Sequence, residues 1–210
     1  MEKLCYILII FIVIISIKMF FESDIYNLKC VISTVDGNKY CVRERKNLKK
    51  TANLLAKVTV KMKTLVELTG KDYNNNKNVK ILTNKFNPKK IKEILPTSQY
   101  TAYSENKGEK IAFCTTKTKN GNELIDENTL TFVAIHELAH IMSISIGHTK
   151  EFWDNFKFLL KRAVDYNLYE PINYGVNPKR YCGMEINDNP YFDKDVKKDL
   201  SIEKQNKWTI

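Results

Sequence analysis

The chain is poor in histidine: it has three in 210 residues, and all of them fall between His136 and His148. None of its five cysteines forms a Cys-x-x-Cys pair, which argues against a zinc site built from cysteines. Glycine and proline are also scarce, and 43% of the residues are hydrophobic. This composition indicates a globular protein, long enough for one domain with a sizeable core or for one domain plus an appendage.

The chain has no Asn-x-Ser/Thr acceptor site although it is rich in asparagine, which argues against a long history in a glycosylating compartment. The formal net charge of +10 permits binding to nucleic acid, anionic lipid or acidic protein. The lysines are spread along the chain and form no dense patch, so a solubilising surface is the favoured interpretation. Nucleic acid stays among the permitted partners, with no specific signal in its favour.

The first 21 residues differ in composition from the rest. Residues 4–17 carry no charge, and the apolar run continues to Phe21 with Lys18 as its one interruption. This run would form a helix of about 27 Å, enough to cross a bilayer if Lys18 reaches the headgroups. A cleaved signal peptide, the main alternative, would need small residues at a cleavage site, and these are missing. We expect residues 1–23 to be a transmembrane anchor and residues 24–210 the domain, on either side of the membrane.

The rest of the pattern predicts an α+β domain. Residues 26–45 indicate two strands around a turn at Asp36 and Gly37, flanked by Cys30 and Cys41. Residues 100–115 indicate a second hairpin. Cys114 and Cys182 bring the cysteines of the domain to four, which would allow disulfides on an oxidising side of the membrane. The spacing does not decide between disulfides and free buried thiols.

Three helices are predicted between and after these hairpins. The first is a long amphipathic helix after Asn47, a suitable N-cap, that ends at Gly70. The second runs over about residues 127–146, and the third begins after Thr149, another suitable N-cap.

The three histidines lie in and just after the second of these helices, in the pattern His136-Glu137-Leu138-Ala139-His140. At 100° per residue, His140 lies one turn along the helix and about 40° round from His136, so both rings can bind one ion. Glu137 borders the same face, which suits a base that acts on a metal-bound water. The helix is apolar on all sides and should be buried, where two histidines and a carboxyl are costly unless a cation is bound.

A catalytic zinc site needs a third protein ligand. His148 is the favoured candidate, because Gly147 tolerates the left-handed backbone that ends a helix and lets the chain fold back. A carboxylate of the next helix, with Glu151 the nearest, is the alternative. We therefore predict one zinc ion per chain, held by the three histidines, with one position left for a water whose pKa falls to about 7.

The HELAH motif, the pair Gly147-His148 after six further residues and the segment EFW at 151–153 resemble the zinc metallopeptidases of the WLM and SprT-like group. The resemblance is specific over residues 128–160. These families are zincins, and some of them act on DNA-bound proteins. Longer stretches, among them residues 95–114 and 181–192, resemble uncharacterised proteins of large DNA viruses that carry the same core.

The resemblance implies a zincin-like, layered α+β fold in which a small sheet packs on the HExxH helix and a substrate strand adds to the sheet edge. The strand predicted at residues 110–115 is the candidate for that edge. The resemblance also implies an electrophile that stabilises the oxyanion beside the zinc. Six side chains are candidates for that group: Tyr100, Tyr103, Tyr166, Tyr174, Arg180 and Tyr181.

We therefore expect a membrane-anchored zinc metallopeptidase that hydrolyses peptide bonds. Glu137 would accept a proton from the zinc-bound water and pass it to the leaving nitrogen. The expected partners are a protein or peptide substrate and a membrane, through residues 4–21. The alternatives are a WLM/SprT-like protease that acts on DNA-bound or crosslinked proteins, and a non-catalytic zinc-stabilised binding module.

Overall fold

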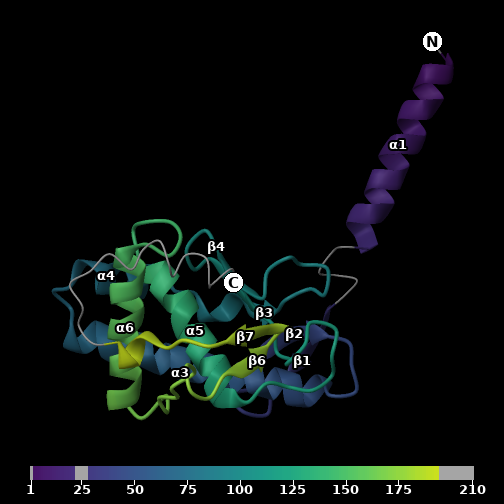
Figure 1. The fold of residues 1–210 in the computed structure, drawn as a ribbon. Coiled ribbons are helices and arrows are strands. Elements are labelled where there is room, and N and C mark those ends of the chain that lie inside the picture. The colour runs from purple at the N-terminus through teal and green to yellow at the C-terminus, as the bar shows by residue number, and fades with distance from the viewer. Residues whose placement is uncertain (1, 22–27, 194–210) are drawn as a thin grey trace.

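A computed structural model describes residues 2–21 and 28–193 (Figure 1). The first described element, α1 (Glu2–Phe21), is long and apolar enough to be a membrane span or a signal sequence. Its residues 3–20 have a mean hydropathy of 2.4, and none of them is buried against the other residues that the structure describes. The predicted boundary between anchor and domain, at residues 23 and 24, lies outside the described residues.

The domain is built on a five-stranded mixed sheet, which confirms the α+β class. The strands are β1 (Leu28–Ile32), β2 (Lys39–Arg43), β3 (Ile91–Glu93), β4 (Ala102–Glu105) and β5 (Lys110–Phe113), in the order β1-β2-β3-β5-β4. Both predicted hairpins are confirmed, since β1 pairs antiparallel with β2 and β4 with β5. Parallel pairing through β3 joins the two hairpins into one sheet.

The prediction of the substrate-binding edge is wrong. The strand expected there, β5, lies inside the sheet between β3 and β4, so β4 is the edge strand on this side. The reason is the strand β3, which has three residues and pairs parallel with β5, with Ile91 opposite Ile111. No local sequence pattern indicates this pairing. The backbone edge nearest the central helix α5 (Glu127–Met142) therefore belongs to β4.

The described part of the domain contains four helices, of which two contact this sheet directly. They are α3 (Leu48–Asp72), α4 (Lys77–Lys85), α5 and α6 (Lys150–Asp165). The short 3₁₀ turns Pro88–Lys90 and Pro190–Phe192 follow α4 and β7. The apolar stripe of α3 packs against β1, β2 and β3, and α5 lies between α3, α4 and α6 (Figure 1). Nearly every residue of α5 is buried, as its uniformly apolar sequence predicted.

The predicted end of α3 at Gly70 is wrong, because the helix continues to Asp72. Gly70 instead permits the close approach of α4: a Cβ at this position would lie 2.7 Å from Cγ2 of Thr83. The small size of Gly70 is thus needed for the packing of α3 against α4, and not for the end of a helix.

The predicted end of α5 near residue 146 is also wrong, since the helix stops at Met142. Ser143 leaves the helix with extended backbone while its hydroxyl donates to the Ala139 carbonyl. Gly147 does adopt the left-handed conformation, with φ of 80°, but in the loop that follows the helix. The next helix begins as predicted, with Thr149 accepting a hydrogen bond from the Phe152 amide.

Two disulfides answer the question that the cysteine spacing left open. Cys30 and Cys41 are cross-strand partners in the first hairpin and are bonded to one another. Cys114, just after β5, is bonded to Cys182 in the turn between β6 (Lys179–Tyr181) and β7 (Met184–Ile186). The second disulfide fastens this C-terminal hairpin to the main sheet.

The two disulfides should differ in their contribution to stability. Their cysteines are 68 and 11 residues apart in sequence, and a cross-link restricts the unfolded chain more when it closes a longer loop. Replacing Cys114 and Cys182 with alanine should lower the free energy of unfolding by about 4 kcal/mol, and the same change at Cys30 and Cys41 by about 3 kcal/mol. Denaturant titrations of the full chain in one detergent would measure both, and a larger loss for the hairpin pair would contradict the loop-length argument.

Candidate metal centre

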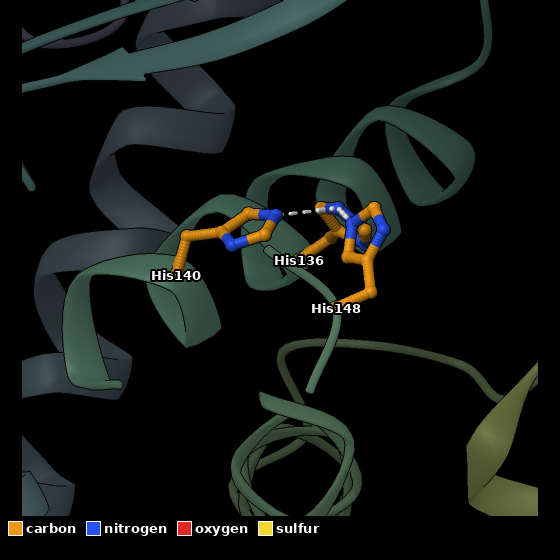
Figure 2. Close-up of side chains that lie close together, drawn as sticks. All are labelled: His136, His140 and His148. Atoms are coloured by element: carbon orange, nitrogen blue, oxygen red, sulfur yellow. Dashed lines mark hydrogen bonds between the residues drawn. The ribbon is translucent and has the colours of Figure 1, made fainter. Parts of the chain in front are cut away.

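Three imidazole rings converge beside the C-terminal half of α5 (Figure 2). His136 and His140 come from successive turns of this helix, and His148 comes from the loop before α6. The Nε2 atom of His136 lies 3.2 Å from Nε2 of His140 and 3.2 Å from Nε2 of His148. The structure thus brings together the three histidines that the sequence predicted as ligands, with all their ligand atoms within 4.8 Å of one another.

This spacing fits a metal ion better than it fits a hydrogen-bond network. Nitrogen ligands at about 2.0–2.1 Å from a tetrahedral zinc are about 3.3 Å apart. A ring nitrogen, by contrast, either donates one proton or offers one lone pair, so Nε2 of His136 can form a hydrogen bond with only one of its two neighbours. A cation between the rings satisfies all three nitrogens at once.

Burial keeps the imidazoles in the neutral form that binds metals. Desolvation, and then the neighbouring His148 and Lys107, lowers the pKa of His140 to about 3. Desolvation and the two other rings hold the pKa of His136 well below its usual value, and burial also lowers the pKa of His148. These lowered pKa values favour the neutral rings, whose nitrogens are able to bind a metal ion.

Glu137 follows the first of these histidines and borders the same cleft as His140 and His148. Its side chain is 2% exposed, and burial raises its pKa to about 8. Its Oε2 atom has no hydrogen-bond partner among the described residues. A buried polar atom without a partner is costly, and a polar ligand in the cleft would remove that cost. The carboxyl thus lies where it can exchange a proton with such a ligand.

A single aromatic ring from α6 supports all three imidazoles, and the sequence analysis did not assign it this part. Phe152 is fully buried, and its ring centroid lies 4.3 Å from that of His140, 4.7 Å from His148 and 4.8 Å from His136. In the sequence, the segment EFW stands out by its position after the last histidine. Phe152, the aromatic residue that follows Glu151, is the signal from which this contact could have been predicted. Packing of α6 on α5 therefore orients the rings.

Glu151, the alternative third ligand, does not face the imidazoles. Its carboxylate accepts hydrogen bonds from the amides of Ile144 and Ser145, at 3.0 and 2.9 Å, and from the Ser145 hydroxyl at 2.7 Å. These bonds hold its pKa at about 2. Asn78 of α4 also donates to it, at 3.3 Å. Glu151 is thus engaged by the loop that carries His148.

The same loop is held from its other side by Lys107, in the turn between β4 and β5. The ammonium group donates to the carbonyl oxygens of Ser143, Ile144 and Ser145. The Glu151 carboxylate, bound to the amides, and the Lys107 ammonium, bound to the carbonyls, thus fix residues 143–145. We call this pair of side chains the loop clasp. Because His148 lies three residues further on, the loop clasp determines where the third ring lies.

A cleft of about 800 Å³ opens beside the rings, between the edge strand β4 and the loop of His148. Its lining includes Tyr100 and Tyr103, two of the six candidates for an oxyanion-stabilising group. The other four are placed elsewhere: Tyr174 and Tyr181 are fully buried, Tyr166 donates to Asp72, and Arg180 is exposed on β6. The cleft is therefore bounded by the edge strand β4, two phenols and the candidate metal centre.

Comparisons with known proteins find relatives in viruses. The chain is 30% identical to the uncharacterized protein R325 of Acanthamoeba polyphaga mimivirus over 163 residues, which cover 75% of this chain and 82% of that protein. It is 37% identical over 83 residues to the uncharacterized protein 042R of Invertebrate iridescent virus 3, covering 40% and 50% of the two chains. Over 73 residues it is 38% identical to the uncharacterized protein 136R of Invertebrate iridescent virus 6, covering 34% and 40%. No family model and no solved structure matches the chain.

The loop clasp should contribute to metal affinity although Glu151 is not a ligand. Replacing Glu151 with glutamine removes the charge that orders Ile144 and Ser145, so zinc affinity should fall about tenfold while one ion per chain still binds. Competition with a chromophoric chelator would measure this. The matched control is Asp154→Asn, one turn further along α6 at an exposed position. Equal affinities for the two variants would show that the loop is ordered without Glu151.

Removal of the third ring should have a larger effect. The variant His148→Ala keeps only two nitrogen ligands for the ion. Its zinc affinity should therefore fall by more than the roughly 10–100-fold loss that is typical when a residue that supports a ligand is replaced. Metal content measured by mass spectrometry after gel filtration would give the stoichiometry. Full zinc in this variant would mean that another side chain supplies the third ligand.

Proposed function

This chain belongs to the same protein family as the uncharacterized protein R325 of mimivirus, and we propose that it is a zinc-dependent metallopeptidase of the zincin type, attached to a membrane through α1. The observation that carries the proposal is the set of three neutral imidazoles beside a buried carboxyl in an open cleft. His136, His140 and His148 would hold the ion, and Glu137 would be the catalytic residue.

Bound zinc would supply a Lewis acid that polarises the substrate carbonyl and makes water a better nucleophile. The protein supplies the proton transfers. A cation bound to the three rings would favour the ionised form of Glu137. The Glu137 carboxylate would then accept a proton from the attacking water as the water oxygen joins the carbonyl carbon, and would give that proton to the leaving nitrogen as the C–N bond breaks. The products are a carboxyl group and an amine, and Glu137 returns to its initial state.

The cleft supports an extended polypeptide as the substrate. The outer edge of β4, which pairs with no other strand of the described residues, borders the cleft. An extended chain can add to such an edge through backbone hydrogen bonds that do not depend on sequence. A peptide bond held along β4 would lie next to Glu137 and His140. Tyr100 and Tyr103 line the same space and are the phenols available to stabilise the oxyanion.

Membrane attachment is supported by the exposure of α1, because a long apolar helix of which residues 3–20 are not buried against the described part of the domain is more stable in an apolar environment than in water. The two disulfides favour an oxidising compartment for the domain. A second candidate function, proteolysis of DNA-bound proteins, is favoured by the net charge of +10 together with the likeness to SprT-like peptidases. A requirement for DNA during cleavage would distinguish it.

Replacing Glu137 with glutamine should separate an enzyme from a zinc-stabilised binding module. The variant should bind one zinc ion and lose a factor of about 10²–10⁴ in turnover, because it can no longer accept the proton. The assay would follow cleavage of an unfolded protein by the full chain in detergent, with and without duplex DNA.

The matched control for this assay is Glu127→Gln. Glu127 lies in the first turn of the same helix and pairs with Lys57 and Lys61 at the surface, so this variant should keep full activity. Removal of zinc with a chelator should abolish cleavage, and added zinc should restore it. Undiminished cleavage by Glu137→Gln would exclude the proposed base.

A further inference from the structure

The two disulfides of the domain differ in their access to solvent. Cys114 and Cys182 are 0% and 4% exposed, and both belong to the hydrophobic core. Cys30, by contrast, is exposed, and Cys41 is half-buried. A thiol exchanges with a disulfide only when it reaches one of the two sulfur atoms. The fold therefore leaves the Cys30–Cys41 bond open to thiols and shields the Cys114–Cys182 bond.

A surface groove of about 560 Å³ lies at the Cys30–Cys41 disulfide. Both cysteines line it, together with Leu28 of β1, Lys39 of β2 and Ile91 of β3. Its volume falls within the range of about 300–1,000 Å³ that is typical of small-molecule sites. A molecule the size of a tripeptide thus has room to approach the disulfide while β1 and β2 remain paired.

Strand β1 contributes little buried surface to the domain. Of its five residues, Leu28 is buried and Val31 is half-buried, whereas Lys29, Cys30 and Ile32 are exposed. Among the described residues, the attachment of β1 therefore depends largely on its pairing with β2 and on the disulfide that joins the two strands.

The turn after β1 is fastened to α3 independently of the disulfide. Oδ1 of Asn53 accepts hydrogen bonds from the Ser33 hydroxyl at 2.8 Å and from the Thr34 amide at 3.0 Å. The Asn53 side-chain amide also donates to the Thr34 hydroxyl at 2.9 Å. These bonds hold the hairpin together at its turn when the disulfide is open. Cys30 then stays near Cys41, its partner in the strand register, and the bond can form again.

We propose that the Cys30–Cys41 disulfide is a site of reversible thiol–disulfide exchange in the folded protein, and that its reduction by small thiols loosens β1. The proposal is independent of the peptidase activity and of the membrane attachment proposed above. It assigns the two disulfides to different tasks: the buried bond stabilises the fold, and the exposed bond responds to the thiols around the protein.

The exchange proceeds in two steps. A thiolate attacks the exposed Sγ of Cys30 and forms a mixed disulfide, while the Cys41 sulfur leaves as a thiolate. A second thiolate then attacks the outer sulfur of the mixed disulfide and releases Cys30. The two external thiols are oxidised to their disulfide by loss of two electrons, and the protons that they lose balance those that Cys30 and Cys41 take up.

Reduction at this site would act on β1 and leave the candidate metal centre in place. In the order of the sheet, β1 lies at the opposite end from β4, the strand that borders the cleft. A bond between two opposing strands prevents their separation, so its loss permits local opening of β1. Because β1 is the first described strand after α1, the change affects the part of the domain that follows the apolar helix.

Reduction of the full chain in detergent tests the first half of the proposal. The protein would be incubated with millimolar reduced glutathione, and thiols would be trapped by alkylation at successive times and measured for each cysteine by mass spectrometry. Cys30 and Cys41 should become thiols at least about 100-fold faster than Cys114 and Cys182. Cys5, which is a free cysteine, provides the reference for complete labelling.

Two controls accompany this experiment. In guanidinium chloride the two disulfides should be reduced at similar rates, which would show that the fold causes the difference. Replacement of reduced by oxidised glutathione should restore the Cys30–Cys41 bond in the folded chain.

Hydrogen exchange of the same samples tests the second half. The amides of residues 28–32 should exchange at least about tenfold faster in the reduced protein than in the oxidised protein, whereas those of α5 should be unchanged. The double variant Cys30→Ser, Cys41→Ser should show the exchange of the reduced protein without any reductant.

Three results would overturn the proposal. Equal rates of reduction for both disulfides in the folded chain would show that exposure of Cys30 does not control the reaction. Failure of the Cys30–Cys41 bond to form again in oxidised glutathione would exclude a reversible site. Unchanged hydrogen exchange at residues 28–32 after reduction would show that β1 is held without the disulfide.

Discussion

Three imidazole rings and a carboxyl meet where the buried helix α5 reaches a cleft, and the rest of the domain is arranged around that constraint. Helix α5 can carry His136 and Glu137 in its buried interior only because α3, α4 and α6 cover it on several sides. Burial keeps the rings neutral and leaves Glu137 with an oxygen that has no partner among the described residues. Such a group is unfavourable in an apolar core and favourable next to a cation, so the fold tolerates a local cost that metal binding would remove.

The third ring is positioned by parts of the chain that are distant in sequence. Lys107 comes from a β-hairpin turn and Glu151 from the start of α6, and together they satisfy the backbone of residues 143–145. Phe152 packs against His148 and also contacts the two imidazole rings of α5. The site is consequently a property of the tertiary structure: the HExxH helix supplies two nitrogens, and sheet, loop and second helix are all needed for the third.

Local chemistry determined what could be predicted from the sequence. The turn at Asp36 and Gly37, the all-apolar character of α5, the N-cap at Thr149 and the ligand spacing are each contained in a few neighbouring residues, and the structure agrees with them. The failures depend on distant partners. The edge strand was predicted wrongly because β3, which has only three residues, pairs with both β2 and β5. The end of α5 was predicted wrongly because Lys107 and Glu151 bind the backbone carbonyls and amides that follow the helix. Glu151 was weighed as a ligand from proximity in sequence alone, whereas its carboxylate binds amides of the loop.

One hairpin connects the two sides of the candidate site. Strand β4 presents the edge that borders the cleft, and the turn that follows it carries Lys107 to the loop of His148. A peptide that ordered β4 would therefore also order Lys107, the side chain that helps to position the ring of His148. Linkage requires the converse as well: an ion that fixes His148 stiffens the strand that the peptide joins. Metal and an extended peptide would then bind with positive cooperativity, and the apoprotein would bind such a peptide more weakly than the holoprotein.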